Sequence, residues 1–104
     1  MIVVTTDEVP GRRIVATIGV VRGNTVRAAN AGRDLAAWLK NVVGGEVEEY
    51  TKLLAESREQ ALDRMIAEAI ARGANAVVGL RFVTCEISAG CAELLAYGTA
   101  VTLE

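Results

Sequence analysis

One stretch of this sequence constrains the fold more than any other, because it is apolar on both faces. Between Arg12 and Arg22, residues 14–21 read IVATIGVV and are apolar at nearly every position, and β-branched residues of this kind favour a strand. A strand with apolar side chains on both faces must be covered on both faces. One layer of helices covers only one face of a small sheet. We therefore expect a second layer or a neighbouring subunit on the other face, with Gly23-Asn24 ending the strand.

The middle of the chain predicts two helices. Apolar residues recur at helical spacing from about Gly32 to Val43, and Gly44-Gly45 stops that segment. A stronger stripe repeats at i, i+3 and i+4 from Glu46 to Arg72, with Gly73 at the position typical of a helix end. A helix of that length measures about 39 Å, whereas a compact chain of this size has a radius of gyration of about 13 Å. We expect a kink near 56–58 or an extension onto a partner.

The last third of the chain predicts a β-hairpin. Its strands cover Asn75–Cys85 and Glu93–Leu103, with a turn at Ser88-Ala89-Gly90. One face of the last strand carries small residues and is expected to face the long helix; these residues are Leu94, Ala96, Gly98 and Ala100. With a short strand at Ile2–Thr6, the order is β-β-α-α-β-β. The prediction is one α+β domain over residues 1–104, with an antiparallel sheet packed on a long helix.

Composition predicts self-assembly and limits the partners and the cellular compartment of such a domain. Hydrophobic residues make up 52% of 104 residues, which is more than a small core hides and predicts an oligomer interface. Eleven basic and 13 acidic residues leave a net charge of −2, without the basic excess of a nucleic-acid binder. No apolar run approaches the roughly 20 residues that span a bilayer. Two cysteines and no recognisable signal peptide favour the cytoplasm, with neither nucleic acid nor membrane as partner.

The two cysteines are the first candidate for chemistry. Cys85 and Cys91 lie on the two arms of the predicted hairpin, where they could face each other. Two thiolates favour a soft metal ion such as zinc or copper, and Glu86 or Glu93 could add oxygen ligands. A closed zinc site needs four ligands, so a second pair would have to come from another subunit. A labile disulfide and ordinary packing remain alternatives.

Four polar residues are the second candidate. Arg33 and Asp34 lie in the first helix region, and Arg58 follows Tyr50 by eight positions on one side of the long helix. They could hold a small anionic ligand or line an enzyme cleft. The alternative is a buried structural ion pair or a bridge between subunits. The chain has no histidine, so no nucleophile–base pair involving that residue exists. The glycines show no nucleotide-binding fingerprint.

Several blocks of this sequence resemble the YbjQ-like family of bacterial and archaeal proteins, which is labelled heavy-metal-binding. The resemblance covers essentially the whole chain. It rests on Pro10-Gly11, GVVRG at 19–23, Gly44-Gly45-Glu46 with Tyr50 and Leu53, Arg58 with Ala61, GANAVVGLRF at 73–82 and YGTAV at 97–101. The resemblance implies a dodecin-like subunit assembled into a ring-shaped homopentamer, and it implies no reaction. Some members carry a cysteine where this chain has Ile18, so no metal ligand is carried over.

Sequence and resemblance together predict a non-enzymatic homopentameric ring that binds a heavy metal ion or a small ligand. The alternatives are an enzyme with a cleft around Arg33, Asp34, Tyr50 and Arg58, or a purely structural assembly protein.

Overall fold

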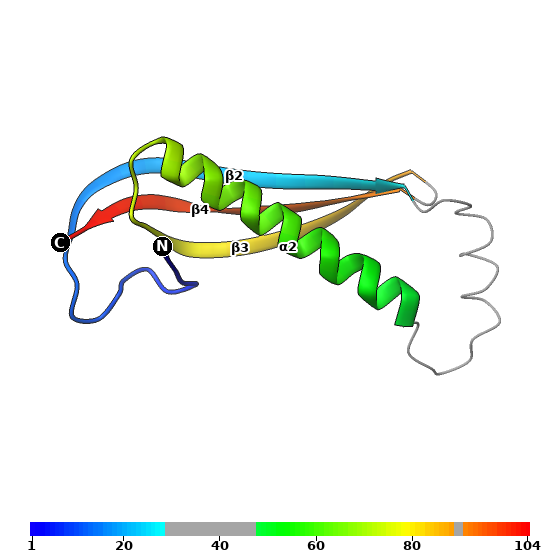
Figure 1. Cartoon of the computed structure of the whole chain (residues 1–104), viewed down its shortest axis with the longest axis horizontal. Coiled ribbons are helices and arrows are strands. Elements are labelled where there is room, and N and C mark those ends of the chain that lie inside the picture. The colour runs from blue at the N-terminus through cyan, green and yellow to red at the C-terminus, as the bar shows by residue number, and fades with distance from the viewer. Residues whose placement is uncertain (29–47, 89–90) are drawn as a thin grey trace.

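Four strands and one long helix make up the part of the chain that the computed structural model describes, residues 1–28, 48–88 and 91–104 (Figure 1). The elements are β1 (Ile2–Val3), β2 (Ile14–Ala28), α2 (Glu48–Ala71), β3 (Ala76–Ser88) and β4 (Cys91–Leu103). Helix α2 crosses one face of a long, narrow sheet (Figure 1). The chain is therefore α+β, as predicted. The helix expected at Gly32–Val43 lies outside the described residues.

The sheet is mixed, with the strand order β1-β3-β4-β2. Strand β4 is antiparallel to both of its neighbours, as the hairpin pattern predicted. Strand β1, however, runs parallel to β3, with Ile2 opposite Ala76. The prediction of an antiparallel sheet is wrong at this edge, because the chain begins at the end of the sheet where β3 also begins. A hydrogen bond of 2.9 Å from the Val4 amide to the Val77 carbonyl continues the pairing.

Strand β2 is longer than the sequence predicted. It was expected to end at Gly23-Asn24, but it runs from Ile14 to Ala28. Gly23 remains in the strand because α2 packs directly on its main chain. A Cβ atom built at Gly23 would collide with the main chain of Ala61 and Met65. The glycine thus permits close approach of the helix rather than ending the strand.

The main core lies between α2 and the sheet. Helix α2 packs chiefly on β2 and β4, and much less on β3. The predicted small face of β4 does face the helix; the buried residues of this core are Val21, Ala61, Met65, Ala69, Val77, Leu80, Leu94, Ala96 and Ala100. Gly98 has a different role from the one expected. A Cβ there would lie 2.7 Å from Val77 Cγ1, so this glycine makes room for β3 and not for the helix.

On the opposite face of the sheet, the described residues cover one end and leave the rest of the face open. There the segment before β2 packs a second, smaller cluster; its buried members are Ala76, Val78, Val101 and Leu103, with Ile2, Val4, Val9 and Ile14 against them. Beyond this end, apolar side chains are exposed. Val20 is 62% exposed, Val26 53% and Val83 46%. The expectation of an uncovered apolar face therefore holds for the described residues.

Helix α2 ends where the sequence predicted. Gly73 has a φ of +86°, its amide bonds to the Ile70 carbonyl at 3.0 Å, and the Ala74 amide bonds to the Ala69 carbonyl at 3.0 Å. These two bonds form a Schellman motif. The helix continues through 56–58 without interruption. The molecule is correspondingly elongated. Its extents are 53 × 24 × 16 Å and its radius of gyration is 16.9 Å.

We expect Gly23→Ala to lower the free energy of unfolding by about 1–3 kcal/mol, the usual cost of overpacking. The added methyl group would push α2 away from β2, because main-chain atoms of the helix cannot rotate aside. Urea unfolding followed by circular dichroism measures the change. Arg22→Ala, at the neighbouring exposed position, is the control and should stay within about 0.5 kcal/mol of the parent. Equal stability of the two variants would contradict the role given to Gly23.

Candidate functional site

The two cysteines lie near the hairpin end of β3 and β4, and both thiols are free. Cys85 is opposite Glu93, whereas Cys91 is opposite Ser88. The cysteines therefore do not face each other directly, and that prediction is wrong. The reason is the pairing register: Cys85 lies opposite Glu93, two residues beyond Cys91 on β4, and a register shift between Glu86 and Ser88, where β3 contains one extra residue, places Cys91 opposite Ser88.

The cysteines nevertheless share one face of the sheet. Side chains alternate along β4, so Cys91 and Glu93 point to the same side, and Cys85 points there too because it pairs with Glu93. The two cysteines are diagonal neighbours, a relation in which residues lie about 7–8 Å apart. This spacing is at or beyond the limit for an unstrained disulfide. It suits two thiols that share a ligand between them.

Glu93 is held away from the cysteine pair. Its Oε2 atom accepts a hydrogen bond from Asn24 Nδ2 at 3.1 Å. Asn24 belongs to β2, which flanks β4 on the side opposite β3, so the carboxylate leans away from Cys85. Among the residues that the structure describes, no three His, Cys, Asp or Glu side chains form a group able to hold a metal ion. A four-ligand zinc centre therefore does not fit within these parts of one chain.

The second predicted cluster is only partly described. Arg33 and Asp34 lie outside the described residues, and of Tyr50 the structure gives the main chain in α2 but not the side chain. Arg58 is exposed on α2. The interpretation of Arg58 as part of a buried ion pair is therefore wrong. A cleft that gathers all four residues remains a prediction.

A row of charged residues that sequence reasoning did not connect to the sheet lies along α2. Its members, Arg64, Glu68 and Arg72, are four residues apart and so share one side of the helix. Arg64 Nη1 donates to the Asn24 carbonyl at 2.6 Å. Arg72 donates from Nη1 to the Val20 carbonyl at 2.8 Å.

The charged row makes two further hydrogen bonds to the main chain of β2. Arg72 Nη2 donates to the Ile18 carbonyl at 3.1 Å, and the Arg22 amide donates to Glu68 Oε2 at 3.5 Å. Strand β2 is an edge strand, and these are main-chain groups that a further strand would otherwise bind. The charged row thus closes the edge of β2 between residues 18 and 24. The i, i+4 spacing was visible in the sequence, but its partners were not.

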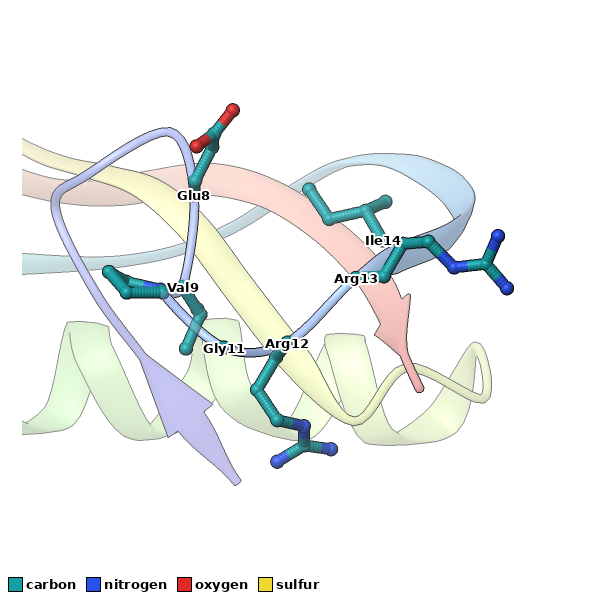
Figure 2. A pocket seen from close by; sticks show the side chains of 7 residues that line it. Glu8, Val9, Gly11, Arg12, Arg13 and Ile14 are labelled. Carbon is teal, nitrogen blue, oxygen red and sulfur yellow. The ribbon is translucent and has the colours of Figure 1, made fainter.

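A pocket of about 320 Å³ lies beside the turn that precedes β2; it is lined by Glu8, Val9, Pro10, Gly11, Arg12, Arg13 and Ile14. Figure 2 shows that the side chains of Glu8, Arg12 and Arg13 point in different directions. Both arginines already bind Glu104. Arg12 Nε donates to its main-chain oxygen and Arg13 Nε to its side-chain carboxylate, each at 2.7 Å. The pocket therefore lacks convergent groups, and its arginines fasten the last residue of the sequence to the start of β2.

Comparison with known proteins decides the family. The model of a family described as "Putative heavy-metal-binding" matches residues 1–104. The chain belongs to the YbjQ family. Relatives named UPF0145 protein include one from Archaeoglobus fulgidus, 57% identical over 103 residues, which cover 99% of this chain and 95% of that protein. One from Clostridium perfringens is 49% identical over 104 residues, which cover 100% of this chain and 98% of that protein.

A solved structure supports the fold. It is a crystal structure of a protein of unknown function from the DUF74 family in Pediococcus pentosaceus. It matches with a TM-score of 0.69 at 15% identity, and covers 100% of this chain and 98% of that one. The likeness extends the YbjQ-family fold to a distant sequence and says nothing of activity. No helix in the described part of this chain is both long and apolar enough to cross a membrane.

We expect Arg72→Met to lower the free energy of unfolding by about 1–2 kcal/mol, because four hydrogen bonds of the charged row anchor α2 to β2 and two of them come from Arg72. Partial exposure of Arg72, 41%, keeps the effect at the low end. Chemical unfolding measures it. Arg58→Met, at an exposed position of the same helix, removes the same charge and should be close to neutral. If both variants unfolded at the same denaturant concentration, the anchoring role would be refuted.

Proposed function

We propose that this chain is a non-enzymatic subunit of a homo-oligomeric ring, a homopentamer, that binds a heavy metal ion or a small ligand. The observation that supports assembly is the presence of two exposed apolar patches on opposite sides of one thin sheet. The resemblance to the YbjQ-like family supports five subunits. The family's description supports a metal or related ligand.

The first patch is on the face opposite α2. We call it the sheet patch. Its members come from β2, β3 and β4, and their side chains point away from the helix; they are Val20, Val26, Val83, Leu95 and Tyr97. Its valines are about half exposed or more, and Tyr97 is 36% exposed. Clustered apolar exposure of this kind is typical of surfaces that bind other proteins.

The second patch is on the helix side. We call it the helix patch; it consists of Leu62, Ile66, Ile70 and Phe82. Leu62, Ile66 and Ile70 follow one another at intervals of four along the flank of α2 opposite the charged row. Ile70 is 59% exposed and Phe82, on the helix side of β3, is 43% exposed. The patch exists because α2 lies over β2 and β4 and leaves β3 uncovered by the described residues.

Two different patches on opposite sides favour head-to-tail contact. If the sheet patch of one copy packs on the helix patch of the next, every copy uses both patches, and the chain of contacts closes into a ring when the rotation allows it. A dimer with two-fold symmetry would instead use one patch twice and leave the other exposed. The closed β2 edge is consistent with packing through faces rather than through added strands at residues 18–24.

Two neighbouring residues of β3 allow the head-to-tail arrangement to be tested. Phe82 pairs with Ala96 on the helix side, and Val83 pairs with Leu95 on the other face. We expect the parent protein to have five times the mass of one chain by light scattering. We expect Phe82→Lys and Val83→Lys each to be monomeric, because a charge in an apolar contact is costly. An equimolar mixture of the two should give a discrete dimer, since each variant keeps one intact patch.

Gln60→Lys is the control, because it adds the same charge at an exposed position of α2 outside both patches, and it should stay assembled. A symmetric contact would give a different result: only one of the two β3 variants would dissociate, and mixing would not create a dimer. A monomeric parent protein at micromolar concentration would refute assembly altogether.

A further inference from the structure

The cysteine pair specifies which kind of metal ion this chain can take. We propose that Cys85 and Cys91 of one chain bind a single soft monovalent cation, Cu⁺ or its analogue Ag⁺, between two thiolates, and that they do not form a zinc site. This inference rests on the proposed metal-binding role and narrows it to an ion class, a coordination number and a pair of residues.

The donor set excludes the usual zinc arrangement within the described parts of the chain. Zinc in closed sites takes four ligands in a tetrahedron. Here the face offers two thiols, and no third acidic or thiol group joins them to make a group of three. The one carboxylate of suitable position, Glu93, is bonded to Asn24 Nδ2 at 3.1 Å on the side away from β3.

Two thiolates alone satisfy a different class of ion. Thiolates are soft ligands that select Cu⁺ among the biological metals, and monovalent ions with a filled d shell form stable complexes with two thiolates in a nearly linear arrangement. Such an ion needs its two sulfur atoms on opposite sides of it. Diagonal neighbours on one face of a hairpin, with about 7–8 Å between the residues, place two thiols at a suitable separation for this.

In the single chain, the pair is open to solution at the hairpin end of the face that carries the sheet patch. Cys85 is exposed and Cys91 is partly buried. The Cys85 thiol has only a long contact, 3.7 Å, from Sγ to the Glu86 carbonyl, so little holds it in its present rotamer. It can turn toward Cys91 without breaking a strong hydrogen bond.

The test is titration of the reduced, metal-free protein with Ag⁺, and with Cu⁺ in competition with bicinchoninate, with the bound ions counted by native mass spectrometry. We expect one Ag⁺ or one Cu⁺ per chain and no Zn²⁺ uptake under the same conditions. Cys85→Ser and Cys91→Ser should each weaken Cu⁺ binding by about 100-fold or more, since even outer partners of a metal ligand are worth 10–100-fold. Glu93→Gln is the matched control and should bind as the parent does.

The outcomes separate this inference from the proposed function. Zn²⁺ binding as tight as Cu⁺ binding, or a marked loss in Glu93→Gln, would show a larger donor set and overturn the two-thiolate site. One ion for every two chains would place the site between subunits and overturn it as well. If both serine variants still bound the metal ion, a heavy-metal role would remain, but Cys85 and Cys91 would be refuted as its ligands. The monomeric Phe82→Lys variant, whose lysine is on the face opposite the cysteines, should still bind one Cu⁺ per chain, so loss of assembly and loss of metal are read independently.

Discussion

The direct packing of α2 on the main chain of β2 at Gly23 is the contact on which the rest of the structure depends. No side chain separates helix from strand at that point, so the helix lies close over an edge strand instead of over the middle of the sheet. That position brings Arg64, Glu68 and Arg72 beside the outward carbonyl and amide groups of β2. The short distance between α2 and β2 also buries Ala61 and Met65 completely.

The off-centre helix also explains where apolar surface is left over. Because α2 covers β2 and β4, the helix side of β3 keeps Phe82 exposed, and among the described residues the N-terminal segment covers the opposite face at one end only. Within residues 1–28, 48–88 and 91–104, a thin sheet with one off-centre helix leaves large apolar side chains exposed, in line with the high hydrophobic content of the sequence. The exposed apolar residues form two patches on opposite sides of the sheet, which is the basis for the proposed head-to-tail assembly.

Local signals in the sequence predicted local structure well. The i, i+4 stripe and Gly73 gave the long helix and its end, and alternation with a turn gave the β3–β4 hairpin, because each pattern involves residues close together along the chain. Predictions failed where distant segments meet. Gly23 looked like a strand breaker until α2 packed on it, and β1 could not be known to run parallel to β3. For the candidate site, the sequence identified the cysteines but not their register, since the strand pairing places Cys85 opposite Glu93 and Cys91 opposite Ser88.

By itself, then, the sequence determined the types of the described elements, the apolar excess, the family and the two cysteines, because these depend on composition and on neighbours along the chain. Only the tertiary structure decided what each of them is used for. It decided that a glycine supports a helix, that a charged row closes a sheet edge, and that Glu93 turns to Asn24 and away from Cys85. Those outcomes depend on contacts between residues about 40 to 70 positions apart, and no local pattern records which strand a side chain will meet.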